Sequence, residues 1–392
     1  MPEENYAELL QAAEAGNADA MEKVAYRLYE GNGVERDQFE AYNWYYKAAE
    51  AGNVKAMYVY SCLISTGLDK DGEERDKDEE KADIFNWCLK AAKGGYLPAI
   101  TKAAELYAIG EGTEKNKKKA MELLGRLPRD EAGRAMNTIA FECSTGPEAL
   151  EWYTRSAEYG NAQSMLKLST IYATGHIHVR CYQGEDGATQ DSNLALTWAQ
   201  KSARAGNYMA LMRLANYYYI GDNATQSYEE AFREYERANR AGVQSAMMQL
   251  GRMYYFGRGT RKNLRKAFGQ LQLAEECLPM TGLPLTYLGQ MYEWGEGITQ
   301  DCNKAKHCYE AAIKNDTTGI AIYRLAQLYF YGRGVVQDAA KALELFIQAA
   351  ENRNIDKSYR ILAARKVAKM YELGEGIPAD PAKAQEWQDK IS

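Results

Sequence analysis

Apolar and polar positions recur along the chain with the spacing of an amphipathic helix, and the same pattern returns ten times. Each copy runs into a glycine, and six residues before that glycine stands a small residue in all ten copies. The glycines are Gly31, Gly67, Gly110, Gly146, Gly175, Gly221, Gly257, Gly295, Gly332 and Gly374. Tyrosine stands three residues before the glycine in seven copies. These spacings place the small residue and the tyrosine on one face of a helix. The pattern therefore predicts a first helix that another helix approaches closely at that face.

A second helix is predicted after each glycine. It is marked by alanine with tryptophan three positions later, as at Ala41 and Trp44, and it ends in a Gly-Asn pair, as at Gly52 and Asn53. Glycine suits the left-handed residue that ends a helix, and asparagine suits the turn that starts the next one. A Gly-x-Gly turn joins the two helices, and an aspartate after it is placed to cap the second helix. The expected caps include Asp37, Asp301 and Asp338.

The domain organisation is predicted from the start of the repeat pattern and from its irregular copies. Residues 12–17 match the end of a second helix without a first helix before it, so residues 1–16 are expected to form an N-terminal half-repeat cap. Residues 17–392 then form one continuous array. The fourth repeat has almost no loop between Gly146 and Ala149, and insertions at 67–80 and 175–191 follow the second and fifth glycines.

The repeated residues resemble Sel1-like repeats, which are relatives of the tetratricopeptide repeat. Residues 325–342 reproduce most of the family pattern, from Leu325 and Ala326 through Gly332 and Gly334 to Asp338, Lys341 and Ala342. The resemblance implies an all-α fold, an α/α superhelix that forms a right-handed solenoid of about ten helix-pair repeats. It also implies protein interaction as the usual role, and it implies no catalytic residues.

Composition narrows the class of protein further. The 392 residues carry 48 basic and 54 acidic side chains, a net charge of -6, with 46% apolar and 26% charged residues. This is the composition of a folded, soluble protein, and its mild acidity argues against a nucleic-acid binder. Residues 1–20 have neither a basic start nor an apolar run, so we expect no signal peptide and no membrane insertion. Seven cysteines at irregular spacing favour free thiols in the cytoplasm.

Several groups of residues resemble chemical motifs without the required context. The Gly-x-Gly turns follow helices rather than strands, which is against a phosphate-binding loop. A zinc site at His176, His178 and Cys181 has no evident fourth ligand, although Asp186 is near. The acidic insertion at 69–74 departs from the calcium-loop spacing. We therefore assign no metal site and no cofactor.

Two further groups are also interpreted structurally. Cys302, His307 and Cys308 could form a cysteine nucleophile with its base, but Cys308 takes the tryptophan position of the repeat, so core packing explains it. Basic residues gather at 115–119 and at 258–266, where solvated turns are the more common explanation. No catalytic residue is assigned, and the chain is predicted not to be an enzyme.

The first helices are expected to line the inner surface of the solenoid. By analogy with tetratricopeptide repeats, positions twelve, nine, five, two and one before each glycine face inward, and repeats six to nine place aromatic residues and methionines there with few charges. Repeat one has the acidic Asp19, Glu22 and Glu30 instead. The predicted partner-binding residues are Met212, Tyr219, Arg252, Tyr255, Phe256, Gln290, Trp294, Tyr323, Gln327, Phe330 and Tyr331. These aromatics are expected to have no packing role of their own, because the alanine, leucine and tyrosine stripes already supply the core.

Two functions follow from this pattern. The first is a non-enzymatic adaptor or scaffold that binds a peptide or protein segment on the concave surface. The alternative is an immunity-type protein or inhibitor that occludes a toxin or enzyme, a role that the resemblance suggests from some bacterial relatives. An adaptor is expected to bind an extended segment on the concave surface alone, whereas an inhibitor is expected to use the insertions at 67–80 and 175–191 as well.

Overall fold

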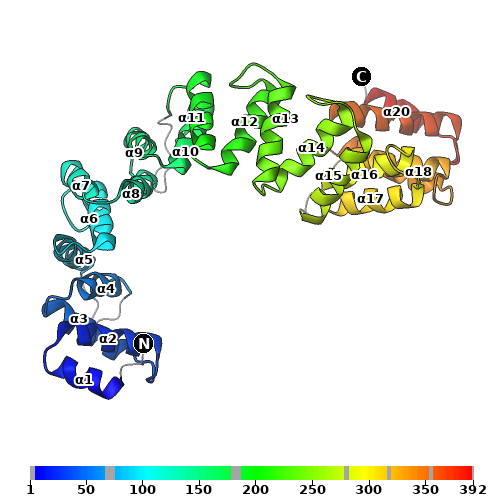
Figure 1. The fold of residues 1–392 in the computed structure, drawn as a ribbon. Coiled ribbons are helices and arrows are strands. Elements are labelled where there is room, and N and C mark those ends of the chain that lie inside the picture. The colour runs from blue at the N-terminus through cyan, green and yellow to red at the C-terminus, as the bar shows by residue number, and fades with distance from the viewer. Residues whose placement is uncertain are drawn as a thin grey trace. The chain divides into compact units, whose positions relative to one another are not determined.

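The chain is all-helical, as the repeat pattern predicts. The computed structural model describes residues 5–66, 76–177, 187–277, 282–315, 319–352 and 356–390. These residues form 21 helices and contain no strand. The contacts divide the chain into two units, Met1–Asn207 and Tyr208–Ser392, although the repeat continues through the boundary without interruption. Figure 1 shows the helices in chain order from blue to red.

The N-terminal unit begins with one unpaired helix, α1, and continues with five helix pairs. Its helices are α1 (Tyr6–Glu14), α2 (Ala18–Glu30), α3 (Gln38–Glu50), α4 (Val54–Ile64), α5 (Lys77–Lys93), α6 (Leu97–Ile109), α7 (Lys117–Leu124), α8 (Arg129–Glu142), α9 (Gly146–Glu158), α10 (Ala162–Thr174) and α11 (Ser192–Arg204). The even-numbered members are the first helices of their repeats. Each contacts the second helix that follows it.

The C-terminal unit holds five further pairs with the same alternation. Its helices are α12 (Tyr208–Ile220), α13 (Tyr228–Arg240), α14 (Ser245–Phe256), α15 (Leu264–Cys277), α16 (Gly282–Trp294), α17 (Cys302–Asn315), α18 (Gly319–Tyr331), α19 (Ala339–Glu351), α20 (Lys357–Leu373) and α21 (Pro381–Asp389). Its core lies between the two helices of each repeat and extends to the next repeat.

The turn between the paired helices explains the repeated glycine. Eight of the ten glycines have φ between +66° and +81°, the left-handed region in which a side chain would be strained. Asp37 and Asp338 then accept hydrogen bonds from the backbone N–H three residues ahead, as predicted for caps of the second helices. Repeat four differs, because α9 begins at Gly146 itself and the glycine belongs to the helix.

The small residue six positions before each glycine allows close helix packing. At Gly289 in α16, a Cβ atom would lie 2.5 Å from a ring carbon of Tyr309 in α17. Ala215 and Ala326 hold the same position in α12 and α18 and are fully buried. The predicted close approach is therefore confirmed, and the approaching helix is the second helix of the same repeat.

The tryptophans of the second helices contribute to the core as expected. Trp44, Trp152 and Trp387 are buried, and Trp87 and Trp198 are half-buried. Parts of both insertions, residues 67–75 and 178–186, lie outside the described residues. The acidic segment 69–74 and the zinc candidates His178 and Cys181, with Asp186, are among them.

Candidate protein-binding wall

In the C-terminal unit the first helices form a common side. Helix α16 contacts α18, and α18 contacts α20, more extensively than consecutive second helices contact each other. Side chains also bridge α14 to α16, since the ring of Tyr287 lies 5.7 Å from that of Tyr255 and 6.0 Å from that of Phe256. We call this side, formed by α12, α14, α16, α18 and α20, the first-helix wall.

A row of exposed apolar side chains follows this wall. The residue directly before the turn glycine is large and apolar in all five repeats, with exposed fractions between 47% and 67%. The row consists of Ile220, Phe256, Trp294, Tyr331 and Leu373. The same position in the N-terminal unit holds Glu30, Thr66, Ile109, Thr145 and Thr174. Exposed apolar side chains that recur at one position in successive repeats mark an interaction surface more often than scattered single residues do.

Arginines lie against the exposed rings. The guanidinium of Arg258, which follows the glycine of repeat seven, lies 5.3 Å from the ring centre of Phe256 and 5.8 Å from that of Tyr219. It also donates a hydrogen bond of 2.6 Å to the Tyr219 hydroxyl, so it links α12 to the end of α14. Arg258 is exposed, as expected for a solvated turn, and it also contacts the wall rings, which the sequence pattern did not predict.

Arg333 holds the equivalent position in repeat nine. Its guanidinium lies 5.0 Å from the ring centre of Trp294 and 5.2 Å from that of Tyr331. Arg324 in α18 lies 5.8 Å from the Trp294 ring. The wall therefore carries more positive charge than expected, because the sequence pattern placed few charged residues on this surface. The missed arginines stand eight residues before the glycine and one after it, positions that the inward-facing pattern did not include.

Several predicted wall residues pack between helices. Met212 is only 9% exposed. The half-buried Tyr323 packs its ring 5.5 Å from Phe346, and Phe330 packs 6.5 Å from the same ring. The expectation that the wall aromatics have no packing role is therefore wrong for Tyr323 and Phe330. It fits the exposed rings of the apolar row.

Tyr255 also connects neighbouring repeats. Its hydroxyl donates a hydrogen bond to the carboxylate of Glu296, beyond the end of α16. Burial raises the pKa of Tyr255, and the bond to Glu296 raises it further, so the hydroxyl stays protonated and acts as a donor. Tyr255 is thus a bridge between repeats seven and eight as well as a wall residue.

The predicted polar anchors lie on the same wall. Arg252 donates a hydrogen bond of 3.1 Å to Gln249, one turn earlier on α14. Gln327 accepts from Arg324 at 3.2 Å and donates to the hydroxyl of Tyr323 at 3.3 Å. Gln290 is half-buried on α16. The structure thus brings the eleven predicted residues to one unit, where they divide into exposed rings and half-buried or buried supports.

The comparison with protein families agrees with the helix pairs. The Sel1 repeat model matches residues 18–53, 54–96, 97–126, 146–161, 162–207, 209–243, 244–275, 285–316, 319–354 and 361–387. These ten matches cover most of the chain. The chain belongs to the Sel1 repeat family.

Sequence relatives of this Sel1 repeat protein are fungal. Chitin synthase regulator SKT5 of Saccharomyces cerevisiae is 27% identical over 245 residues, which cover 57% of this chain and 32% of the relative. Chitin synthase regulatory factor 3 of Schizosaccharomyces pombe is 27% identical over 208 residues, which cover 50% of this chain and 21% of the relative. The chain thus spans about a third or less of the length of these relatives.

Solved structures from bacteria share the fold. The antigen c5321 of uropathogenic Escherichia coli, described as displaying an SLR fold, has a TM-score of 0.54 and 24% identity, covering 98% of this chain and 86% of that one. A Sel1 repeat protein from Oxalobacter formigenes has a TM-score of 0.50 and 22% identity, with 89% and 86% covered. Fungal and bacterial proteins therefore both resemble this chain. Across the described part of this Sel1 repeat protein, no helix has the length and apolar character needed to cross a bilayer.

Among the cysteine and histidine candidates of α17, Cys308 has the environment of a structural residue. Cys308 packs against the core of repeats seven and eight, and burial raises the pKa of its thiol to about 11. A thiol with such a pKa holds little thiolate near neutral pH. His307 is largely exposed and lies 3.7 Å from Glu310. The described residues hold no group of three His, Cys, Asp or Glu side chains arranged as metal ligands.

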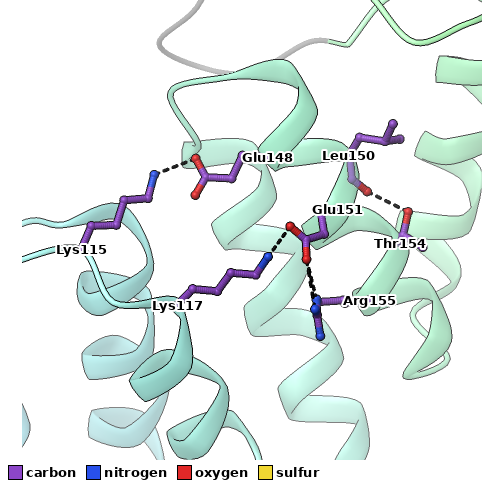
Figure 2. Close-up of polar contacts among 7 residues, drawn as sticks. All are labelled: Lys115, Lys117, Glu148, Leu150, Glu151, Thr154 and Arg155. Atoms are coloured by element: carbon purple, nitrogen blue, oxygen red, sulfur yellow. Dashed lines mark hydrogen bonds and ion pairs between the residues drawn. The ribbon is translucent and has the colours of Figure 1, made fainter.

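The basic residues at 115–119 take part in ion pairs between repeats three and four. Figure 2 shows Lys115 directed at Glu148, with 2.7 Å between nitrogen and oxygen, and Lys117 directed at Glu151. Glu151 also pairs with Arg155, and its pKa is lowered chiefly by the hydrogen bond from Lys117. The start of α9 at Gly146 brings these carboxylates within reach of the preceding turn. Lys115 and Lys117 therefore connect two repeats, while Lys118 and Lys119 are exposed as expected for a solvated turn.

Proposed function

We propose that this Sel1 repeat protein is a non-enzymatic adaptor that binds an extended protein segment along the first-helix wall of its C-terminal unit. The observation that carries the proposal is the row of exposed apolar side chains, one from each of five successive repeats. Repeats that stack in order offer such a row at regular intervals, which suits an extended ligand better than a small compact one.

The exposed rings are the proposed anchors. Phe256, Trp294 and Tyr331 combine large apolar area with neighbouring guanidinium groups, and aromatic residues beside arginine are typical of binding hot spots. Ile220 and Leu373 extend the row on both sides. The predicted residues that are half-buried or buried would act by holding the shape of the wall.

The relatives support an adaptor rather than a catalyst. The fungal relatives are named as regulators of chitin synthase, and an adaptor that binds an enzyme would act as such a regulator. A non-enzymatic role also agrees with the raised thiol pKa of Cys308. The partner proposed for this chain is a protein or peptide segment, and no cofactor is proposed.

Photo-crosslinking from single wall positions tests this proposal. A photoreactive phenylalanine would replace Phe256, Trp294 or Tyr331 in turn, and Phe39 of α3 would serve as the control. Phe39 is 48% exposed, close to the 47% of Phe256, but lies on a second helix of the other unit. We expect the same partner to be captured in native extract from the three wall positions and not from position 39.

Other crosslinking results would contradict the wall. Equal capture from position 39, or capture only from positions placed in 67–80 and 175–191, would exclude the wall as the main site. The second result would favour an inhibitor that covers a globular face. Each crosslinked variant should keep the wild-type circular dichroism spectrum, because the replaced rings are exposed.

A further inference from the structure

We propose that the segment bound by the first-helix wall is acidic and carries carboxylates close to large apolar side chains. This inference rests on the proposed function and specifies the chemistry of the partner. It comes from the arginines that accompany the apolar row and from the carboxylates that could neutralise them.

The wall has more cations than carboxylates. Helices α14, α16 and α18, together with the residue after each turn glycine, contain four arginines and two glutamates, although the whole chain has a net charge of -6. The arginines are Arg252, Arg258, Arg324 and Arg333. The glutamates are Glu293 and Glu296. This part of the surface therefore differs in sign from the average of the chain.

Both glutamates are already engaged within the protein. Glu293 is fully buried, accepts a hydrogen bond of 2.8 Å from Tyr309 and lies 3.3 Å from Arg333. Glu296 accepts the hydrogen bond of Tyr255. These carboxylates are committed to contacts between helices.

Three guanidinium groups pair with neutral partners only. Arg252 donates to Gln249, Arg324 donates to Gln327, and Arg258 donates to the hydroxyl of Tyr219. In the described part of the chain, none of these three arginines forms an ion pair with a carboxylate. An arginine has five N–H donors, so each keeps capacity for a carboxylate from outside.

The rings place these guanidinium groups well for recognition. Arg258 and Arg324 lie against Phe256 and Trp294, and a guanidinium held on an aromatic face keeps its N–H edge available to a carboxylate. A carboxylate binds that edge through two parallel hydrogen bonds, which are stronger than neutral ones.

The wall presents apolar and cationic groups side by side. Rings and guanidinium groups lie against each other in repeats seven to nine. A segment that carries carboxylates close to large apolar side chains can therefore engage both kinds of group on this side. Such a segment matches the wall in charge and in apolar character.

Three short labelled peptides test the proposed chemistry on the full chain. One combines Glu with Leu, the second has Gln in place of Glu, and the third has Lys in place of Glu. We expect the Glu-Leu peptide to bind at least about tenfold more tightly than the Gln-Leu peptide in a fluorescence anisotropy titration. Its affinity should fall with added salt, since exposed charges are screened.

A matched pair of variants localises the effect. Arg258→Gln should weaken the Glu-Leu peptide about tenfold or more and leave the Gln-Leu peptide unchanged. Arg261→Gln removes the same charge from the same exposed turn, where no ring contact is found among the described residues, and should weaken binding less than about twofold. Phe256→Ala should weaken both peptides, since it removes apolar contact.

The outcomes separate the two proposals. Four results would each overturn the proposal that the bound segment is acidic. Three concern the peptides: equal affinity for the Glu-Leu and Gln-Leu peptides, preference for the Lys-Leu peptide, or binding of none of the three. The fourth is an equal effect of Arg258→Gln and Arg261→Gln. If Phe256→Ala still weakened the peptides, or the wall positions still captured one partner by crosslinking, the adaptor proposal would stand. If Phe256→Ala did not weaken the peptides and the wall positions captured no common partner, the first-helix wall would be rejected as a binding site.

Discussion

The carboxylate of Glu293 and the guanidinium of Arg333 lie 3.3 Å apart although they belong to successive repeats. Glu293 sits in α16 with no exposed surface, and its second oxygen accepts a hydrogen bond from Tyr309 of α17. The same guanidinium lies against the rings of Trp294 and Tyr331. A buried carboxylate thus holds a cation at the surface of the first-helix wall.

Removal of this cation should destabilise the fold. In Arg333→Gln the buried Glu293 carboxylate would keep only its bond to Tyr309, and an uncompensated buried charge is costly. The Arg333 side chain is 29% exposed, so solvent reduces the effect, and we expect a loss of about 1–3 kcal/mol in the free energy of unfolding. Urea denaturation measures it.

Arg258→Gln is the control for this prediction. It removes a guanidinium that lies against wall rings in the same way, but it leaves no buried carboxylate behind. We expect a change within about 0.5 kcal/mol. Equal urea midpoints for the two variants would show that the pair with Glu293 does not stabilise the repeats.

Two glycines within helices should respond to alanine in opposite directions. At Gly289 a Cβ atom would lie 2.5 Å from the ring of Tyr309, so Gly289→Ala should cost about 1–3 kcal/mol through overpacking. Gly269 in α15 has no atom within 4 Å of such a Cβ, so Gly269→Ala should stabilise the protein by about 0.5–1 kcal/mol. Thermal unfolding of both variants checks the signs, and a shift of the same sign in both would contradict the close contact of α16 with α17.

Substitutions at two neighbouring wall aromatics should separate effects on stability from effects on partner binding. Phe330 is half-buried against Phe346, with the Lys366 nitrogen 3.6 Å from its ring centre, so Phe330→Ala should cost about 2 kcal/mol of stability. Tyr331 is 56% exposed, so Tyr331→Ala should change stability by less than about 0.5 kcal/mol and weaken partner binding by about 2 kcal/mol. Melting curves and binding titrations are compared for both variants. A Tyr331→Ala variant that binds normally would remove that residue from the proposed anchors.

Alkaline pH should weaken the N-terminal unit through its buried thiol. Cys143 is 2% exposed, and burial raises its pKa from 9.0 to about 12. Below pH 9 the folded and unfolded states both keep the proton, whereas between pH 9 and 12 only the unfolded thiol releases it, so unfolding becomes more favourable. The stability difference between wild type and Cys143→Ala should therefore narrow as the pH rises above 9.

The matched variant for the thiol is Cys62→Ala, at an exposed cysteine of α4. The stability differences of both variants from wild type are measured by urea unfolding over the same pH range. A Cys143→Ala difference that stays constant would mean that the folded state does not hold this thiol in its neutral form.

The repeat pattern alone predicted the helix pairs, because it is a local property repeated ten times. Glycine is favoured where φ reaches values such as +75° at Gly31, and an aspartate such as Asp37 caps the helix that begins beside it. The small residue at Gly289 likewise marked a close helix contact, since space for another helix constrains side-chain size directly. These features depend on neighbours within one repeat.

Only the tertiary structure decided which wall residues are exposed. Phe330 and Tyr331 are adjacent in sequence and similar in type, yet one packs against Phe346 while the other faces solvent. The difference depends on how α19 packs against α18 within one repeat, which helical periodicity does not specify. The sequence alone determined the fold and the candidate residues, whereas helix packing determined their exposure. The stacking of repeats brought Arg333 to Glu293 and Trp294, because these contacts join residues about forty positions apart.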